Sequence, residues 1–517
     1  MKREIHKRLN QTRLNAGDEP TAGSARISRF TYNRNKVTPG VVHFGVGNFH
    51  RCHQAMYFEA LLNKGALDWG IVGVSLRSAT ARDRLAPQDY LYTQVTLSEQ
   101  SRLHIVGALL HILVAPEDPM AVVEQVANPA IKLVTTTITE KGYYLSAGDQ
   151  NVKHPDFLAD LESLLCPKTI YGYLAAAIIR RHSRSLETNT TPLNIVCCDN
   201  IQAGGERLRT GVTTMLERHS PGSAQWARSH IRFASSMVDR VSPTTTIELT
   251  EKVSSDLGLQ DDWPVSAEPF SQWVIEDRFD GEQPALASVG VQFSADVTQY
   301  EQMKLRFLNA AHSAIAVLGY LDNRPTVHEA LEQTDIDGFV SDFLLETLVP
   351  VTTIPSGERA TDYIASVLQR FRNSALPYQV LQICTDSSQK IQQRWYPSIE
   401  DTLTQGGNTD RFSLMLAAWV VYVQQALPRN DLDDPSADQF RAVQHSPNPV
   451  TEFLQIAGAS QTNFYQNRTF IGEIERYYAK LKKYPLDTVL RELKTHCKGR
   501  LGAQETTHQQ TGENRHA

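Results

Sequence analysis

Short apolar runs rich in β-branched residues alternate with helical stretches through the first half of the chain. Runs of this length and composition are typical of buried strands. Strands that are apolar on both faces belong to parallel sheets covered by helices on each side. We therefore predict an α/β domain with a parallel sheet. The runs are GVVHFGVG (40–47), WGIVGVSL (69–76), IKLVTTTIT (131–139) and LNIVCCDN (193–200).

The pattern changes after about residue 295, where apolar positions recur with helical spacing and strand-like runs become scarce. This favours a second, mostly α-helical domain. The stretch FDGEQPALASVG (279–290) combines Gly, Pro and charge, as junctions do. We predict a polar extension over 1–38, the α/β domain over 39–288, the helical domain over 289–500 and a disordered tail over 501–517. The helical segments are 301–321, 337–351, 361–373 and 411–427.

Gly45 and Gly47 lie between the first predicted strand and a stretch, 49–65, that is typical of one helix ended by Gly65. A dinucleotide pyrophosphate needs this combination of close backbone approach and helix N-terminal amides. His50 occupies the slot of the third glycine in GxGxxG, and a turn that merely ends a strand is the alternative. The strand before and the helix after favour a Rossmann-like cofactor site. Its candidate residues are Gly45, Val46, Gly47, Asn48 and Phe49.

The end of the second predicted strand bears on the choice of cofactor. NAD-binding domains usually place an acid there to bind the ribose, whereas this chain has Ser75 and Arg77, and Asp83 comes later. Arg77 could bind the 2′-phosphate of NADP, or could simply face solvent. These residues do not decide between the two cofactors, and we predict NAD, with NADP possible.

Polar residues follow the third and fourth predicted strands. Ligands bind beyond the carboxyl ends of strands in such sheets, so Asn200 could face substrate and Thr139 and Glu140 could face the cofactor. For Asp199 and Asn200, helix capping is an equally good interpretation. Asp239 follows another apolar pair and precedes an arginine, a pattern more typical of a structural ion pair.

Composition and charge exclude several classes of protein. The chain has 517 residues, 41% hydrophobic and 21% charged, as in ordinary globular proteins of two or more domains. A net charge of −6 gives no reason to expect binding to nucleic acid or to an anionic membrane. The chain has no run of about 18 consecutive apolar residues, so we predict no membrane span. The polar N-terminus lacks the apolar core of a secretory signal. Six sparse cysteines fit reduced thiols, so we predict a cytoplasmic protein. We also predict a monomer or a small homo-oligomer.

Six motifs occur along the chain in a specific order: GVGNFHRCHQA, TITEKGYY, CDN, MVDRVSP, EPFSQWVIED and MKLRFLNAAHS. Together they resemble the polyol-specific long-chain dehydrogenases, the family of mannitol 2-dehydrogenases, fructuronate reductases and arabinitol dehydrogenases. The resemblance runs from about residue 41 to about 425. It implies a Rossmann-like domain, a helical domain, a cleft between them, and metal-independent hydride transfer with a lysine base. The implied substrate is a small polyol, ketose or hexuronate.

The family's site residues match individual positions of this sequence. Its K-x4-N-x2-H motif falls on Lys304, Asn309 and His312, and its strand-tip asparagine falls on Asn200. The resemblance implies that these four are catalytic. It also implies that Asp239 and Lys390 bind substrate. One position departs from the pattern: mannitol-oxidising members carry arginine eight residues before Lys390, where this chain has Gln382, as fructuronate reductases tend to have.

The chemistry explains why a lysine is needed. Without a metal, a side-chain base must take the hydroxyl proton as the hydride leaves carbon. The ordinary lysine pKa of about 10.4 must fall toward about 7–8, and apolar surroundings lower it by penalising the charged form. Lys304 is flanked by apolar residues. In an α-helix, His312 would lie about 12 Å along the axis from Lys304, within about 80° of it, and Asn309 would project at about 140°.

Three alternatives remain at this point. Fructuronate reduction is favoured by Gln382, since Lys390 or Arg394 could bind a carboxylate. A nucleotide-binding regulatory protein without turnover would retain the glycine turn but has no need of the lysine motif. A zinc site built from His43, His50 and His53 lacks an evident fourth ligand, so we predict no metal.

Overall fold

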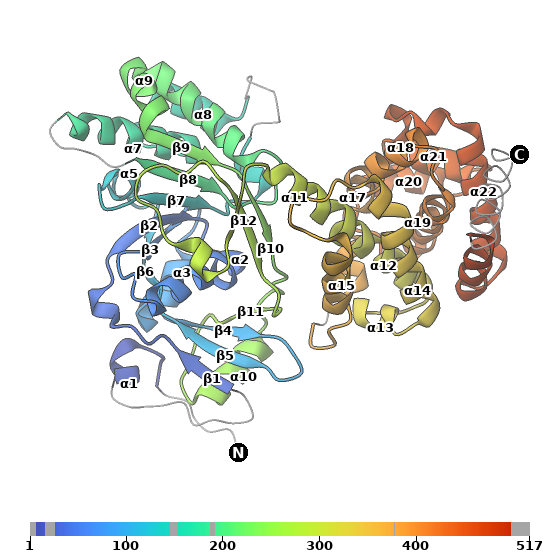
Figure 1. Ribbon diagram of the computed structural model, residues 1–517, viewed down its shortest axis with the longest axis horizontal. Helices are drawn as coiled ribbons and strands as arrows, with labels where there is room; N and C mark the ends of the chain where they lie inside the picture. Colours follow the sequence, from blue (N-terminus) through green and yellow to red (C-terminus); the bar gives the residue numbers. More distant parts are fainter. Residues whose placement is uncertain (1–6, 16–25, 145–152, 187–191, 377, 498–517) are drawn as a thin grey trace, which may run out of the picture. The chain divides into compact units, whose positions relative to one another are not determined.

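The computed structural model describes residues 7–15, 26–144, 153–186, 192–376 and 378–497. The chain divides into two compact units, Met1–Thr298 and Gln299–Ala517. The first is α/β, and the second is mostly helical, with no β-strand among its described residues (Figure 1). The predicted tail over 501–517 lies outside the described residues.

A six-stranded, all-parallel sheet forms the centre of the first unit, in the order β6-β3-β2-β7-β8-β9. The strand sequence runs outward in both directions from the neighbours β2 and β7, so the topological switch point lies between them. In open α/β sheets ligands bind beyond the carboxyl ends of the strands at this point. The four predicted strands and their parallel pairing are confirmed. The bounds are β2 Pro39–Phe44, β3 Gly70–Ser75, β6 Leu109–Val114, β7 Leu133–Thr136, β8 Leu193–Cys197 and β9 Ile231–Ala234.

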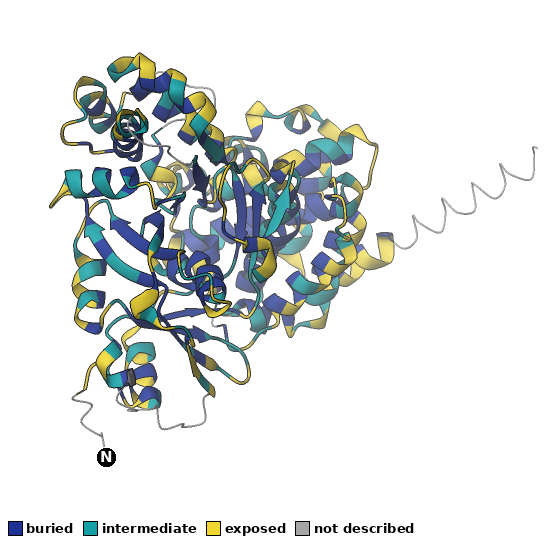
Figure 2. Ribbon diagram, turned by 60° about the vertical axis from the view of Figure 1, so that its left-hand side comes forward, coloured by how far each residue is buried: buried dark blue, intermediate teal, exposed yellow. Residues whose placement is uncertain are grey.

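Both faces of this sheet are buried. Val42 and Phe44 pack into one core cluster with helices α5, α7 and α8, whereas Val41 packs into another with α3 (Gln54–Asn63). Successive side chains of a strand point to opposite faces, which is why the strand sequences are apolar at nearly every position. Figure 2 shows buried strands at the centre of the sheet, whereas the edge strands β6 and β9 also carry residues of intermediate burial. The helices of the first unit include α4 Thr80–Leu85, α5 Pro119–Ala127, α6 Pro155–Glu162, α7 Ile170–Ser185, α8 Gly204–His219, α9 Pro221–His230 and α10 Ile247–Leu257.

The single helix predicted over 49–65 is two helices, α2 (Asn48–Cys52) and α3 (Gln54–Asn63), so that prediction was wrong. The break falls at His53, whose backbone has φ −119° and ψ −87°. Its ring Nε2 lies 2.9 Å from the main-chain carbonyl oxygen of Gln272. The contact between His53 and Gln272, which are distant in sequence, therefore accompanies a break in a stretch whose local pattern is helical.

Part of the predicted polar extension belongs to the fold. Strand β1 (Arg26–Arg29) pairs in parallel with β5. Leu9, Leu14 and Phe30 are buried in a third core cluster. The sequence did not indicate this, because the segment is polar on average. Two smaller sheets, β1-β5-β4-β11 and β10-β12-β13, complete the unit. Their other bounds are β4 Tyr92–Thr96, β5 Arg102–Val106, β10 Ser236–Asp239, β11 Val265–Ala267, β12 Gln272–Glu276 and β13 Gln292–Ser294, and α1 is Gln11–Asn15.

The second unit is built around α19 (Asp410–Arg429), which is buried along most of its length, as helices that are apolar all round are. Two segments are π-helical, Lys304–Asn309 and Phe343–Leu348. No helix among the described residues has the length and apolar content needed to cross a membrane. The remaining bounds are α11 Val297–Met303, α12 Ala310–Leu321, α13 Val327–Leu331, α14 Thr334–Asp342, α15 Ala360–Phe371, α16 Val380–Cys384, α17 Ser387–Arg394, α18 Tyr396–Thr404, α20 Ala437–Val443, α21 Pro449–Ile456 and α22 Arg468–Lys483.

Candidate active site

The turn after β2 needs glycine for two different reasons. Gly45 has φ +98°, and its amide donates to the carbonyl oxygen of Val74 at 2.9 Å. A Cβ there would lie 2.0 Å from the carbonyl oxygen of Thr137. Gly47 is the N-cap of α2, and nothing lies within 4 Å of its Cβ position. Gly45 is therefore required by the fold, whereas Gly47 leaves an open backbone face of the kind a pyrophosphate needs.

A buried histidine fastens this turn to β7. The Nε2 of His43 lies 3.2 Å from the Gly45 carbonyl oxygen and 2.8 Å from Thr137 Oγ1, and its Nδ1 lies 2.7 Å from Thr135 Oγ1. A carbonyl oxygen only accepts, so the proton belongs on Nε2 and Thr135 donates to Nδ1. Burial lowers the pKa of His43 to about 3. The histidine is therefore neutral near pH 7 and acts as a structural hydrogen-bonding group.

We expect the free energy of unfolding to decrease as the pH is lowered, because of His43. An unfolded chain's histidine takes a proton near pH 6.5, whereas folded His43 resists protonation down to about pH 3, so stability declines as pH drops through that window. The contribution is up to about 1.4 kcal/mol per pH unit. Urea titrations between pH 7 and 5 should show a shallower loss for His43→Gln than for wild type. Equal slopes would contradict the neutral buried histidine.

The other predicted residues of the turn use their side chains inside the fold. Val46 is buried in the core, and Phe49 stacks on His53 with ring centroids 4.8 Å apart. The Asn48 side-chain oxygen accepts from Arg51 at 2.7 Å. Cofactor contacts from this turn would therefore come from its backbone. Arg51, a buried guanidinium, was missed by the sequence reasoning because only the folded structure shows it supporting Asn48.

The end of β3 carries no carboxylate at the position expected for a ribose. The strand ends at Ser75, and Arg77 is exposed two residues later. Asp83 lies in α4, where it accepts from Arg82 at 2.8 Å and 3.0 Å. Both interpretations of Arg77, a ligand for a 2′-phosphate and a solvated side chain, fit this placement.

The tips of β7 and β8 meet at the same edge of the sheet as the glycine turn. The strands are parallel neighbours, and Thr139 and Asn200 each lie three residues beyond the end of their strand. Asn200 is exposed, and Glu140 begins a short 3₁₀ turn, Glu140–Gly142. The fold thus brings the predicted cofactor and catalytic candidates of this unit, Gly45, Thr139 and Asn200, to the carboxyl ends of β2, β7 and β8, beside the switch point.

Helix capping was the interpretation of Asp199 from the sequence, and the structure gives this residue a different role. It is buried, and its oxygens accept from the backbone amides of Ile138 and Thr139 on the neighbouring strand tip, at 3.1 Å and 2.7 Å. Asp199 does not cap α8, whose N-cap is Ala203, and its carboxylate is instead bonded to the neighbouring strand tip.

Asp239 is the last residue of β10 and is buried, 3% exposed. The next residue, Arg240, donates to the carbonyl oxygen of Glu268 at 2.9 Å and 3.1 Å and to that of Cys52. This arginine therefore joins the VDR segment to α2 through main-chain oxygens. Sequence reasoning had favoured an ion pair with its aspartate neighbour.

Lys304 and Asn309 are the first and last residues of a π-helix. Backbone bonds in a π-helix join residue i to i+5, so residues five apart lie about one turn apart on the same side. The angle of about 140° predicted from α-helical geometry was therefore wrong, and the two side chains share a face. Met303 and Phe307 beside them are fully buried, in keeping with the apolar surroundings expected for a base. π-Helical turns are frequent at functional sites.

His312 lies on α12, directly after the π-helix, in an aromatic and cationic environment. Its ring stacks on Phe371, with centroids 5.2 Å apart, and lies 4.9 Å from the ring of Tyr378. Burial lowers its pKa well below 6.5, and the charges of Arg394, Lys390 and Arg370 lower it further. His312 is thus neutral near pH 7, able to hold a substrate hydroxyl.

Lys390 and Arg394 lie one turn apart on α17. The Lys390 ammonium donates to the carbonyl oxygen of Ile383 at 3.0 Å, and burial and the charge of Arg394 lower its pKa. Arg394 donates to Ser313 Oγ at 2.7 Å and to the carbonyl oxygen of Asn309 at 3.3 Å. It therefore supports the end of the π-helix. Within its own unit the structure brings together Lys304, Asn309, His312 and the two α17 cations, whereas Gln382 is exposed on α16.

The histidines considered as zinc ligands are used otherwise. The rings of His43 and His50 stack with centroids 3.4 Å apart, and His53 contacts the main chain of Gln272. Within the described ranges, no three His, Cys, Asp or Glu side chains are grouped so that they could hold a metal.

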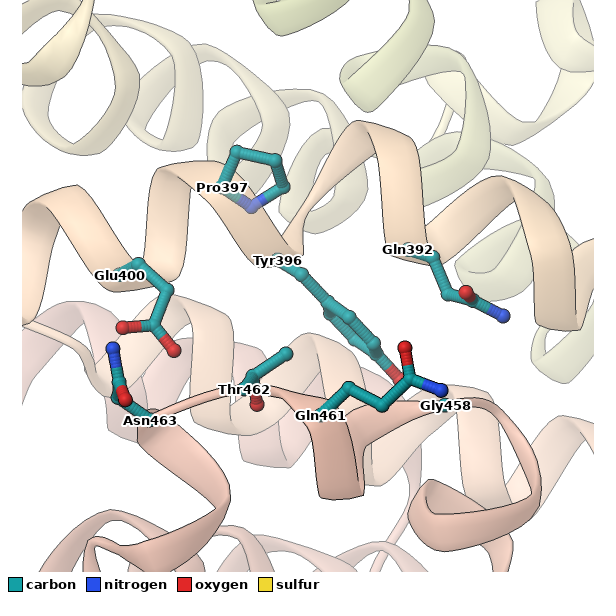
Figure 3. Close-up of a pocket in the computed structure, with 8 residues that line it drawn as sticks. All are labelled: Gln392, Tyr396, Pro397, Glu400, Gly458, Gln461, Thr462 and Asn463. Carbon is teal, nitrogen blue, oxygen red and sulfur yellow. The ribbon is translucent and has the colours of Figure 1, made fainter. Parts of the chain in front are cut away.

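A groove of about 360 Å³ in the second unit lies apart from these residues (Figure 3). It opens between α17, α18 and the segment after α21. Gln392 on its wall is two positions from both Lys390 and Arg394, on the opposite side of α17 at about 100° per residue. No predicted site residue lines the groove, whose walls are Gln392, Tyr396, Pro397, Glu400, Gly458, Gln461, Thr462 and Asn463.

Comparison with known proteins adds an independent line of evidence. The mannitol dehydrogenase Rossmann domain matches residues 39–288, and the mannitol dehydrogenase C-terminal domain matches 296–482. Mannitol 2-dehydrogenase of Phaeosphaeria nodorum is 34% identical, with 88% of this chain and 81% of the relative covered. That of Pyrenophora tritici-repentis is 35% identical, with 87% and 81% covered.

Two solved structures are similar over nearly the whole chain. Mannitol 2-dehydrogenase of Pseudomonas fluorescens, in a ternary complex with NAD and D-mannitol, matches with a TM-score of 0.79 and 31% identity, covering 94% of this chain and 99% of that one. A substrate-free D-sorbitol dehydrogenase matches with a TM-score of 0.75 and 28% identity, covering 90% and 99%.

Proposed function

The chain belongs to the mannitol dehydrogenase family and is thereby a polyol dehydrogenase, and we propose that it interconverts a sugar alcohol of the mannitol type and its ketose with NAD. The observation that carries the proposal is the gathering of Gly45, Thr139 and Asn200 beside the switch point of the sheet. The likeness to a mannitol 2-dehydrogenase solved with NAD and D-mannitol supports the cofactor and the substrate class.

The proposed chemistry divides one reaction between a few side chains. Bound NAD supplies the acceptor for the hydride. Lys304, as the free amine, takes the hydroxyl proton while hydride leaves the carbon, so the alcohol becomes a ketone and the proton passes through the lysine to solvent. Asn200 and Asn309 donate to the substrate oxygen as charge develops on it. His312, Asp239 and Lys390 hold neighbouring substrate groups.

The apolar setting of the π-helix supports the role of Lys304. Deprotonation near neutral pH needs an environment that penalises the ammonium, and buried Met303 and Phe307 contribute to one. Lys304 and Asn309 lie about one π-helical turn apart, which supports the proposal that a base and a donor act on one substrate oxygen. No metal is needed in this scheme, because the base acts directly on the hydroxyl.

Fructuronate reduction is the second candidate, and two observations favour it. Gln382 replaces the arginine expected in mannitol-oxidising members. In addition, the charges of Arg394, Lys390 and Arg370 lower the pKa of His312. Cations near this histidine could bind a substrate carboxylate. Arabinitol is a further substrate that fits the polyol proposal, and Arg77 leaves NADP possible.

A substrate panel tests these proposals directly. We expect NADH formation from NAD⁺ with D-mannitol, weaker turnover with D-arabinitol, and a preference for NAD⁺ over NADP⁺. NADH consumption with fructuronate is measured beside them under the same conditions. Turnover of fructuronate alone would overturn the polyol assignment in favour of the second candidate. NADH binding without turnover of any substrate would indicate a nucleotide-binding regulatory protein.

A further inference from the structure

Asp199 is a buried carboxylate at the tip of β8 on which three donors converge. Its Oδ1 accepts from the Thr139 amide at 2.7 Å, and its Oδ2 accepts from the Ile138 amide at 3.1 Å and the Tyr143 hydroxyl at 2.5 Å. Burial raises the pKa of Asp199, and these hydrogen bonds oppose that rise. All three donors lie in the segment 138–143, which follows β7.

That loop contains a strained residue. Thr139 has φ +67° and ψ 159°, a region that residues other than glycine rarely adopt and that is worst for β-branched side chains. Such a conformation costs on the order of 1–3 kcal/mol and persists only where its surroundings impose it. The bond from the Thr139 amide to Asp199 is a constraint of that kind.

Tyr143 anchors the carboxylate from the other side. Its hydroxyl lies 2.8 Å from Thr136 Oγ1 and 3.2 Å from Cys197 Sγ, while its own carbonyl oxygen accepts from Tyr171 at 2.5 Å. The hydroxyl therefore contacts both strands of the pair, β7 and β8. Asp199 is held in place by packed, buried groups and can transmit that rigidity to the loop.

We propose that Asp199 is a positioning residue that holds Thr139 in its strained conformation and so sets the relative geometry of the β7 and β8 tips. These tips carry the cofactor candidates Thr139 and Glu140 and the catalytic candidate Asn200. The inference rests on the proposed function, because it holds that the strained conformation of Thr139 shapes the proposed cofactor and substrate site. Asp199 is only 7% exposed, so we assign it a role in supporting the site and not in binding a ligand.

The test is a double-mutant cycle between Asp199→Asn and Thr139→Gly. Asparagine has one acceptor oxygen, so Asp199→Asn loses either the Thr139 bond or the pair at Oδ2. We expect kcat/KM to fall about 10²-fold, the scale of a small misplacement of reacting groups. Glycine adopts the Thr139 conformation without strain. Asp199→Asn should therefore cost much less in the Thr139→Gly background than in the Thr139 background.

Tyr143→Phe is the matched control, since it removes one donor to Asp199 and leaves both backbone amides in place. It should lower kcat/KM far less than Asp199→Asn does. Thermal melting of every variant identifies loss of fold. Equal cost of Asp199→Asn in both Thr139 backgrounds would overturn the proposal, because a merely structural aspartate is indifferent to the strain at Thr139.

The cycle is read out by NADH binding as well as by turnover. If the wild type bound NADH but oxidised no polyol, the proposed function would fail. The cycle measured on NADH affinity would still decide whether Asp199 acts through Thr139. Coupling between the two positions in NADH affinity supports the inference, and independent effects overturn it.

Discussion

Replacing Lys304 by alanine is expected to lower kcat for polyol oxidation by about 10²- to 10⁴-fold, the range that one general base contributes. The reason is that no other group on the same face of the π-helix can take the hydroxyl proton: Asn309 is an amide. NADH binding should be retained, because the glycine turn belongs to the other unit. Initial rates and NADH fluorescence titrations measure the two quantities separately.

Two further substitutions distinguish the role of Lys304 as a base from the effect of its positive charge. Lys304→Arg keeps a cation, but guanidinium cannot be deprotonated in proteins, and Lys304→Met keeps the length without a base. Both should be as inactive as the alanine variant. Lys482→Ala, on the exposed side of α22, controls for loss of a lysine. Substantial turnover by Lys304→Arg would refute the base assignment and indicate a purely electrostatic role.

Gly45→Ala is expected to lower the free energy of unfolding by about 2–6 kcal/mol, whereas Gly47→Ala leaves it within about 1 kcal/mol of wild type. The Gly45 backbone has φ +98°, and an added Cβ would meet the Thr137 carbonyl oxygen at 2.0 Å. Gly47 has φ −96° and open space at its Cβ position, so alanine is tolerated by the fold.

The pair distinguishes a structural glycine from a ligand-facing one. Gly47→Ala should weaken NADH binding while melting normally, because its methyl group would occupy the open backbone face. Gly45→Ala should lose stability and NADH binding together. Urea unfolding and fluorescence titration measure these effects. Wild-type NADH affinity in Gly47→Ala would mean that the cofactor does not approach this turn.

The strands and the glycine turn could be predicted from the sequence because their causes are local. Burial on both faces demands apolar residues at successive positions of β2, β3, β7 and β8, so the pattern itself is the signal. Likewise, the site candidates could be named because they sit in ordered motifs. Their geometry could not, since both Asp199 and Arg394 have partners that are distant in sequence.

Residue type alone was enough to establish the order of elements, the α/β and helical halves and the motifs of a polyol dehydrogenase, because these depend on side-chain chemistry repeated along the chain. Tertiary structure decided three things: the break at His53, the π-helical turn from Lys304 to Asn309, and the strained Thr139 held by Asp199. Each is a backbone conformation that local preference disfavours. Each is adopted because contacts between distant segments outweigh the small local free-energy differences that sequence patterns express.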